Sequence, residues 1–395
     1  MIVRPMPVRP LVAGAGPVGL AAALFLTRGG TPVRLIDRAA ARSPWSKALA
    51  VNPRTLELLE PTGVTARMLE LGLKVRGGRF WRGGRAVADV SFEGVRHRYP
   101  YLLALSQGVT ERLLEDALVA AGGAVERGTE LVACRNAGDG VEAELRPSAG
   151  GGGDAGGGAV ERVASPWLLA ADGAHSVARH ALGVGFDGSA FDRPWHLADV
   201  PLDTPLAEDR AHIFFLDDGF LFCLRVVGDA VARAAPAAGA KPAVGPVWRV
   251  MGNVADPAAR LPVGRATGPA VWASTFRIAH RVADRLRVGR VYLAGDAAHV
   301  HSPVGARGMN LGVEDAWTFA RLALAGAADR YDDLRRPVDR RVVKRVELIS
   351  RIARGEGVSA RLVRRFALPR AARVPAVRSR IVATLAGLDH AVPDV

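Results

Sequence analysis

Three widely separated groups of residues have the types and spacing that suit a phosphate-rich ligand. The first is the run Gly14-Ala15-Gly16-Pro17-Val18-Gly19, which matches the pattern G-x-G-x-x-G. Gly14 permits a tight turn, Gly16 lets a pyrophosphate approach the backbone, and Gly19 lets a helix pack closely on a strand. Asp37 follows 21 residues beyond Gly16, where its carboxylate can accept hydrogen bonds from a ribose. This group predicts a dinucleotide site.

The second group lies near the middle of the chain, between Leu168 and Arg179. Asp172-Gly173 follows a short apolar run, and Ser176 and Arg179 stand one helical turn apart. Hydroxyl and guanidinium groups at this spacing suit a phosphate, although Asp-Gly alone is usually only a turn. The second group therefore supports the first but does not define a site alone.

The third group begins with Val291 to Ala294, which predicts a short buried strand ending at Gly295-Asp296. A side chain in place of Gly295 would obstruct the turn. The loop Pro303 to Met309 follows, and we expect Asn310 to cap a helix whose positive end points back toward the strand. The apolar side of that helix is predicted to carry Leu311, Ala316, Phe319 and Ala320.

The residues around these groups predict a β-α-β frame. Pro10 argues that the first strand starts late, because proline has no backbone donor. Gly183 to Gly188 also fits G-x-G-x-x-G, but it precedes no helix, so we expect one dinucleotide-binding unit. The expected strands are Val8–Ala13, Val33–Ile36 and Trp167–Ala171, and the expected helices are Leu20–Arg28, Pro53–Glu60 and Gln107–Ala121.

The rest of the chain predicts more strands and then helices. Alternating residues in Phe80–Tyr99 indicate a β-ribbon, and Gly183–Phe276 reads as short strands. From Tyr331 onward the chain is expected to be helical. Further expected features are a strand pair in Val125–Leu145, a flexible hairpin tip in Ser148–Ala159 and a mobile stretch in Ala230–Pro246.

Length and composition indicate a globular protein of two domains, or one large domain with an inserted layer: 395 residues, of which 49% are hydrophobic and 23% charged. No apolar run approaches the roughly 18 residues of a transmembrane helix, and the N-terminus has no apolar signal core. Cys134 and Cys223 are the only cysteines, which fits a reducing compartment. We therefore expect a cytoplasmic location.

The net charge of +14 is concentrated toward the C-terminus. From Tyr331 to Val395 there are 15 Arg or Lys and 7 Asp or Glu, a balance of +8. Such a segment either binds nucleic acid or an anionic membrane, or is a solvated helical face. Aromatic residues do not interleave with the charges, so we expect no nucleic acid partner, while peripheral membrane contact stays open.

Together and in this order, the three groups resemble the class A flavoprotein monooxygenases, the aromatic hydroxylases built like para-hydroxybenzoate hydroxylase. The resemblance covers about the first 330 residues and is weakest in residues 183–276. It implies an α/β fold: a Rossmann-like FAD-binding domain, an interleaved, mainly β substrate domain, and C-terminal helices. The expected ranges are 1–75, 100–182 and 276–330 for the FAD domain, 76–99 and 183–275 for the substrate domain, and 331–395 for the helical segment.

The resemblance also implies roles for individual residues. Asp37 would contact the adenosine ribose, Asp296 the ribityl chain, and Asp172 would support the pyrophosphate and NAD(P)H use. Lys47 stands where an arginine usually reaches the phosphates, and Arg54 could compensate for the loss of a bidentate contact. The full implied cofactor set is Gly14, Gly16, Pro17, Gly19, Asp37, Arg38, Lys47, Gln107, Arg112, Asp172, Gly295, Asp296, Pro303, Gly308, Met309 and Asn310.

In the family, NAD(P)H reduces FAD, O₂ adds at flavin C4a, and the hydroperoxide transfers oxygen to an electron-rich ring. Catalytic residues then orient the substrate and exclude water, and the candidates are Pro303, Arg307 and His212. Arg307 replaces a commoner glutamine, and it either stabilises negative charge on the flavin or points outward. His212 could hold or deprotonate a phenol, although a lone histidine on a β-ribbon is more often structural.

Two other patterns leave alternatives open. His299 and His301 have H-x-H spacing, which can bind a metal, but no carboxylate or cysteine stands at a helpful distance in sequence, so we expect no metal. Four phenylalanines at strand-like spacing either line an aromatic pocket or pack in a core. These are Phe214, Phe215, Phe220 and Phe222.

The sequence thus predicts a monooxygenase that uses FAD, NAD(P)H and O₂ to hydroxylate a phenolic or polyketide-like molecule, acting as a monomer or homodimer. One alternative is Baeyer-Villiger oxidation or epoxidation by a member of the same family. Another is a degenerate flavin-binding protein whose basic tail engages a membrane or nucleic acid.

Overall fold

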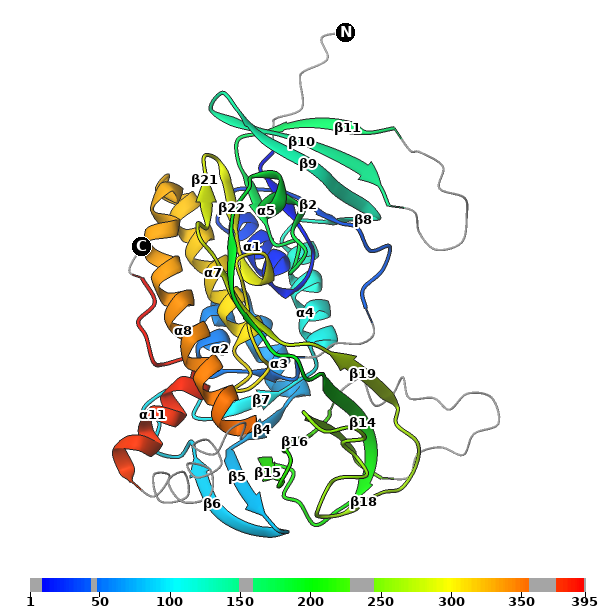
Figure 1. The fold of residues 1–395 in the computed structure, drawn as a ribbon. Coiled ribbons are helices and arrows are strands. Elements are labelled where there is room, and N and C mark those ends of the chain that lie inside the picture. Colours follow the sequence, from blue (N-terminus) through cyan, green and yellow to red (C-terminus); the bar gives the residue numbers. More distant parts are fainter. Residues whose placement is uncertain (1–8, 44–47, 149–158, 228–244, 355–373, 394–395) are drawn as a thin grey trace.

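The computed structural model describes residues 9–43, 48–148, 159–227, 245–354 and 374–393 (Figure 1). A parallel sheet and a mainly antiparallel sheet form its two largest layers, and helices pack beside both. The predicted mixed α/β class is confirmed. The expected hairpin tip and the expected mobile stretch lie largely outside the described residues.

The parallel layer is a six-stranded sheet in the order β21-β22-β12-β1-β2-β8. Neighbouring strands run parallel except at the edge, where β21 is antiparallel to β22. Every residue of β1, β12 and β22 is buried, as is usual for a parallel sheet covered on both faces. The strands are β1 (Leu11–Ala13), β2 (Arg34–Asp37), β8 (Val125–Arg127), β12 (Leu168–Ala170), β21 (Arg287–Val288) and β22 (Val291–Leu293).

The helices beside this sheet begin near their predicted starts. β1 begins at Leu11, directly after Pro10, as the missing proline donor requires. The first helix begins at Pro17, earlier than predicted, because the fixed φ of proline suits the first helical turn. Asn52 caps the next helix by accepting a hydrogen bond from Thr55 N. These helices are α1 (Pro17–Arg28), α2 (Pro53–Leu59), α3 (Val64–Leu71), α4 (Gln107–Ala120) and α5 (Val177–Ala181).

The second layer is an eight-stranded sheet in the order β18-β14-β17-β16-β15-β5-β6, with β19 paired to β14. Its strands come mainly from the region where only short strands were expected. The predicted β-ribbon is shorter than expected and starts earlier, at Gly77. The strands are β5 (Gly77–Arg82), β6 (Arg85–Ser91), β14 (Trp195–Asp203), β15 (Arg210–Phe215), β16 (Phe220–Arg225), β17 (Val247–Gly252), β18 (Arg265–Ala266) and β19 (Trp272–Phe276).

Three small sheets complete the described strands. One of them, β13-β20-β23, joins the two layers, because β13 follows α5 and β23 follows β22 in the chain. Gly188 lies inside β13, so the second G-x-G-x-x-G run leads into a strand and precedes no helix, as expected. The strands are β3 (Ala50–Val51), β4 (Leu73–Val75), β7 (Leu102–Ala104), β9 (Thr129–Ala137), β10 (Gly140–Pro147), β11 (Glu161–Ser165), β13 (Phe186–Ala190), β20 (Ala279–Ala283) and β23 (His299–Val300).

The described C-terminal part is mainly helical, with α7 (Gly308–Leu324), α8 (Tyr331–Arg354) and α11 (Pro375–Ala386), whereas residues 387–393, which were expected to be helical, are not. In Figure 1, α8 lies along α7 and α11 lies beside β6. Basic side chains on the exposed face of α8 pair with acidic ones, as Arg351 does with Glu347. Among the described residues, no helix combines the length and apolar content that a membrane crossing requires.

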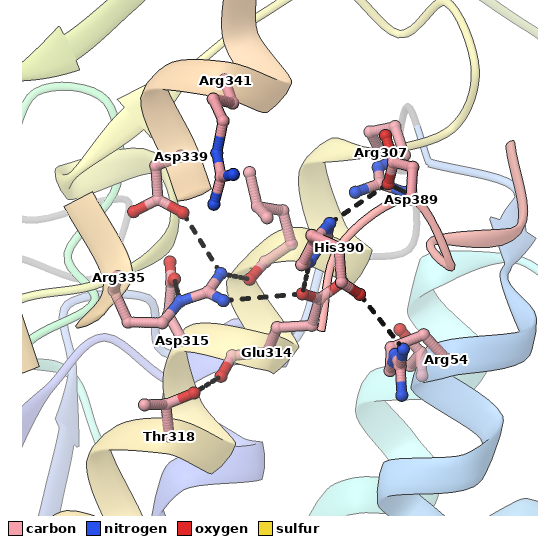
Figure 2. A network of polar contacts seen from close by, with 12 residues as sticks. Arg54, Arg307, Glu314, Asp315, Thr318, Arg335, Asp339, Arg341, Asp389 and His390 are labelled. Atoms are coloured by element: carbon pink, nitrogen blue, oxygen red, sulfur yellow. Dashed lines mark hydrogen bonds and ion pairs between the residues drawn. The ribbon is translucent and has the colours of Figure 1, made fainter. Parts of the chain in front are cut away.

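A buried network of charges joins α7, α8 and the turn after β22. Asp315 accepts hydrogen bonds from Gly295 N (3.0 Å), His299 Nε2 (2.7 Å) and Arg335 Nε (2.8 Å). Arg335 also bonds to Asp339 (3.1 Å), as Figure 2 shows. The side chains of His299, Asp315, Arg335 and Asp339 are at most 1% exposed. Buried charges are tolerated only when they are paired in this way.

The pairing controls the protonation of the network. Burial lowers the pKa of His299, but the charges of Asp315 and Asp339 outweigh it and raise that pKa to about 9. Burial and the nearby Asp315 raise the pKa of Asp339 to about 7. His299, Asp315 and Asp339 have ligand atoms within 4.8 Å of one another, a spacing that a metal could use. However, Arg335 already bonds to both carboxylates, so a guanidinium balances their charge.

We expect the stability of the apoprotein to fall as pH rises from about 6.5 to about 9. A histidine whose pKa is higher in the folded state stabilises that state below its unfolded pKa, and loses this effect as pH rises through the folded pKa. The shift of His299 from 6.5 to about 9 corresponds to a loss on the order of 3 kcal/mol. Urea unfolding at pH 6.5 and 9.5 measures it. His299→Gln should flatten this dependence, whereas His97→Gln should keep it; equal slopes in both variants would contradict the assignment.

Candidate active site

Four neighbouring parallel strands end side by side and bring the three predicted groups together. Ala13 at the end of β1 pairs with Ile36 of β2 and with Ala170 of β12, and Ala170 pairs with Leu293 of β22. The residues that follow these strand ends therefore share one edge of the sheet. They are Gly14, Asp37, Asp172 and Asp296.

The glycine motif leaves space for a ligand at one position only. A Cβ on Gly14 would lie 2.3 Å from Ala171 O, and one on Gly19 would lie 1.8 Å from Gly14 O. Gly14 also has φ +99°, which favours glycine. A Cβ on Gly16 would meet nothing within 4 Å. Gly14 and Gly19 therefore serve packing, and Gly16 opens the backbone at the N-terminus of α1, which fits an FAD pyrophosphate.

We call each of the three groups at these strand ends a corner: residues 14–19 with Asp37, residues 172–179, and residues 295–310. Asp37 completes the first corner. Its carboxylate accepts hydrogen bonds from Ala15 N (2.6 Å) and Ala39 N (2.7 Å), so it fixes the glycine loop as well as standing at the ribose position. Arg38 beside it is exposed.

The second group is mainly a support for the corner. Asp172 Oδ2 accepts hydrogen bonds from Val177 N (2.8 Å) and Ala178 N (3.3 Å), and burial raises its pKa. Ser176 caps α5 by accepting from Arg179 N (3.0 Å). The Arg179 guanidinium, expected at a phosphate, instead donates to carbonyl oxygens of both this corner and the next. These are Ala174 O (2.8 Å) and Ala297 O (3.0 Å).

The third group forms the opposite wall. Gly295 has φ +60°, and a Cβ there would lie 2.8 Å from Val18 Cγ2, which bears out the tight turn. Asp296 is exposed to the cavity described below. Asn310 does not cap α7, which begins at Gly308. Instead it donates to Ala50 O (3.0 Å) and accepts from Asn52 N (3.0 Å), and so ties α7 to α2.

A cavity of about 1330 Å³ lies between these corners and the eight-stranded sheet. Typical small-molecule sites measure roughly 300–1,000 Å³, so this cavity has room for a cofactor and a second ligand. Predicted cofactor residues along its wall are Gly16, Pro17, Gln107, Asp296, Pro303, Gly308 and Met309.

The far side of the cavity is apolar. Strand alternation turns Phe215, Phe220 and Phe222 toward it and Phe214 away, where Phe214 stacks on Trp81 (5.5 Å). Of the two predicted alternatives, three phenylalanines thus line a pocket and one packs in a core. The C-terminal helices, expected as a separate segment, also wall this side through Ile349, Ile352, Ile381 and Leu385.

His212 is a structural residue, contrary to the prediction that it acts in catalysis. It is fully buried on the face of β15 that points away from the cavity. Trp81 Nε1 donates to its Nδ1 (3.0 Å), and its Nε2 donates to Ala207 O (2.9 Å). Burial lowers its pKa, which keeps the ring neutral. Both nitrogens are therefore occupied within the sheet.

Arg307 fits neither predicted alternative. The loop that contains it borders the cavity, yet its side chain is 0% exposed. The guanidinium donates to Thr384 O (2.7 Å) and lies 3.3 Å from Asp389 Oδ1, so it is directed to the C-terminal segment.

Four further basic or amide residues were predicted to lie near the cofactor. Gln107 Nε2 donates to Glu111 Oε1 (2.8 Å), and Arg112 lies half-buried on α4. Lys47 lies outside the described residues. Arg54, expected to compensate for Lys47, pairs with Glu57 (2.9 Å) and is not among the residues that line the cavity.

Sequence reasoning missed a buried charge pair in the cavity wall. Arg249 on β17 binds both carboxylate oxygens of Asp199 on β14, each at 2.8 Å, and lies over the Trp272 ring (5.1 Å). Arg249 also lines the cavity. In the sequence, Arg249 is visible only as a charge inside the apolar run VWRVMG. The alternation of apolar and polar residues along a strand does not reveal that its partner is Asp199, 50 residues earlier.

A parallel sheet with a glycine-opened helix terminus and acidic residues at adjacent strand ends defines a dinucleotide-binding flavoprotein fold. Residues 7–222 and 254–346 match the family described as "FAD binding domain". The chain belongs to this family of FAD-dependent aromatic monooxygenases, as the motifs predicted.

Curated relatives are monooxygenases. The chain is 38% identical over 315 residues to 6-methylpretetramide 4-monooxygenase of Streptomyces rimosus. The aligned region covers 78% of this chain and 54% of the relative. It is 31% identical to pentachlorophenol 4-monooxygenase of Sphingobium chlorophenolicum, over 88% of this chain and 65% of the relative. The chain thus spans between half and two thirds of their lengths.

Solved structures share the fold. The p-nitrophenol 4-monooxygenase of Pseudomonas putida superposes with a TM-score of 0.80 at 21% identity, over 97% of this chain and 98% of that one. The anhydrotetracycline hydroxylase of Streptomyces rimosus gives 0.75 at 25% identity, over 98% and 77%.

Two glycine substitutions should separate cofactor binding from folding. Gly16→Ala fills only open space, so we expect an apoprotein of unchanged melting temperature and an FAD dissociation constant raised at least about tenfold. Gly19→Ala should lower the melting temperature of the apoprotein, because its Cβ would collide with Gly14 O. Calorimetry and flavin fluorescence quenching measure both. Normal FAD affinity in Gly16→Ala would exclude this loop as the pyrophosphate site.

Proposed function

We propose that the protein hydroxylates a phenolic or polyketide-like aromatic molecule, using FAD, NAD(P)H and O₂. The observation that supports this most directly is that one cavity joins the three FAD corners to an aromatic sheet face. Relatives named for tetracycline-type and phenolic compounds point to the same substrate class.

Bound FAD would accept two electrons from NAD(P)H and then activate O₂ for the transfer of one oxygen atom. The chain positions the reactants. Gly16 and the N-terminus of α1 would hold the pyrophosphate, Asp37 the adenosine ribose and Asp296 the ribityl chain. The N-terminus of α7, behind Met309, would direct its positive end at the pyrimidine ring of the flavin and favour negative charge there.

The apolar half of the cavity would bind the substrate ring. Phe80, Phe222 and Met251 project from the sheet, and Ile352 and Ile381 project from the helices. A flat ring between these layers would be shielded from water, and Pro303, in the loop before α7, lines the same cavity. This arrangement orients a ring carbon toward the flavin without needing an acid-base residue.

We infer a matching division of the chain. Residues 1–75, 100–182 and 276–330 would form the FAD domain, and 76–99 and 183–275 the substrate domain. Residues 331–395 would form the C-terminal segment, whose described helices α8 and α11 line the cavity. All six strands of the parallel sheet come from the first set. The protein would act in the cytoplasm; Cys134 and Cys223 are buried and free, as suits a reducing compartment.

The test is a screen of phenols and fused-ring aromatics for stimulated NAD(P)H oxidation by the FAD-loaded protein. We expect a product that gains one oxygen on a ring carbon, seen by mass spectrometry with ¹⁸O₂. Oxygen inserted beside a carbonyl, or peroxide formation alone with every compound, would reject ring hydroxylation.

A cavity variant tests the substrate side. Phe222→Ala should raise KM for the aromatic substrate about tenfold while the FAD dissociation constant stays unchanged, because Phe222 lies on the sheet and not at the corners. Parallel KM and fluorescence titrations measure this. A change in FAD affinity without a change in KM would place the substrate elsewhere.

A further inference from the structure

The turn that precedes α7 holds an unfavourable backbone conformation beside the cavity. Ala306 has φ +54°, a left-handed value that is strained for a residue with a Cβ. Gly305 before it has φ +83°. Both residues, with Arg307, border the cavity. Such strain persists only where surrounding contacts impose it.

Contacts on both sides of Ala306 impose this conformation. Its amide donates to Pro303 O (3.0 Å), and its carbonyl accepts from Asn310 Nδ2 (2.5 Å). The next residue, Arg307, is held by Thr384 O (2.7 Å) and Asp389 (3.3 Å). Among the described residues, Asp389 is the one carboxylate within ion-pair distance of Arg307. The turn thus depends on a segment about 80 residues later in the chain.

That segment is fixed from three helices, and Figure 2 shows its contacts with Arg54 and Glu314. Arg54 of α2 donates to His390 O (3.3 Å), and Arg345 of α8 forms an ion pair with Asp389. His390 Nε2 donates to Glu314 Oε2 of α7 (2.5 Å), and His390 Nδ1 to Asp389 Oδ1 (3.1 Å). The side chains of Asp389 and His390 are only 6% exposed.

The charged side chains of this cluster shift one another's pKa values. Burial raises the pKa of Asp389, but His390 and Arg307 outweigh it and hold that pKa at about 2. Burial lowers the pKa of His390, but hydrogen bonds to Asp389 and Glu314 raise it above its usual value. Removing the Asp389 charge would leave Arg307 buried without its carboxylate, which is strongly unfavourable for a buried ion. The guanidinium would then be driven to move, and the turn with it.

We propose that Asp389 and His390 are positioning residues of the active site. They anchor Arg307, and through it they hold the strained turn from Gly305 to Arg307 in the shape that walls the cavity next to the FAD corners. The proposal rests on the proposed function for its catalytic consequence. When the anchor is lost, the turn relaxes, FAD binds less tightly, and water reaches the reduced cofactor. NAD(P)H, a proton and O₂ then give NAD(P)⁺ and H₂O₂ in place of hydroxylated product.

The experiment compares full-length wild type with Asp389→Asn, which keeps the shape and removes the charge. We expect the FAD dissociation constant, from fluorescence quenching, to rise about tenfold. Amide hydrogen exchange in residues 303–309 should accelerate at least tenfold, while exchange in β1 and β12 stays unchanged. Asp389→Glu should restore part of both effects. The matched control is Asp218→Asn, which breaks an exposed pair with Arg260 (2.7 Å) and should change neither value.

Unchanged FAD affinity and exchange in Asp389→Asn would overturn the proposal even if hydroxylation is demonstrated. Conversely, wild type that binds FAD but hydroxylates no compound would reject the proposed function and leave this test intact. If Asp389→Asn does not fold, Arg345→Gln provides a milder test of the same anchor, because it releases Asp389 from α8 and leaves the Arg307 side chain unchanged. Local acceleration of exchange in residues 303–309 supports the proposal, and uniform acceleration overturns it.

Discussion

The hydrogen bonds accepted by the Asp315 carboxylate are the interaction on which the geometry of the candidate active site depends. This carboxylate accepts hydrogen bonds from the backbone of Gly295, from His299 and from Arg335, and so fixes the turn after β22 to α7 and α8 inside the core. Because these groups are buried, the loss of one partner would leave an uncompensated charge in a medium of low dielectric constant. The position of Asp296, one residue beyond Gly295, follows from this arrangement.

The cavity arises from two different periodicities. Parallel strands place every strand end at one edge, so acidic residues far apart in sequence become neighbours. In the antiparallel sheet, alternation divides adjacent residues between two faces, so Phe215 faces the cavity whereas Phe214 and His212 face a core. The C-terminal helices cover the apolar half. One cavity therefore meets both the cofactor corners and the substrate face.

Local chemistry explains why parts of the site were predictable. Gly14, Gly16 and Gly19 act within one turn, and Asp37 follows them at a spacing that a β-α-β unit fixes. Arg179 was placed correctly on its helix, whereas Asn310 was expected to cap α7 and instead lies inside it. The contacts of both residues were not foreseen, because their partners are carbonyl groups of other segments. The position of His212 on the far face of β15 was not foreseen for a similar reason, since its hydrogen-bond partner Trp81 lies 131 residues away.

The sequence by itself determined the family, the cofactor and the α/β class, since the motifs that carry them are short and each depends on neighbouring residues. Only the tertiary structure decided which side chains face the cavity and where Arg307 points. It also decided that the basic C-terminal region walls the site, with Ile381 and Leu385 in the cavity and Asp389 against Arg307. Such contacts join residues separated by long stretches of chain, and burial selects among many pairings that composition leaves equivalent.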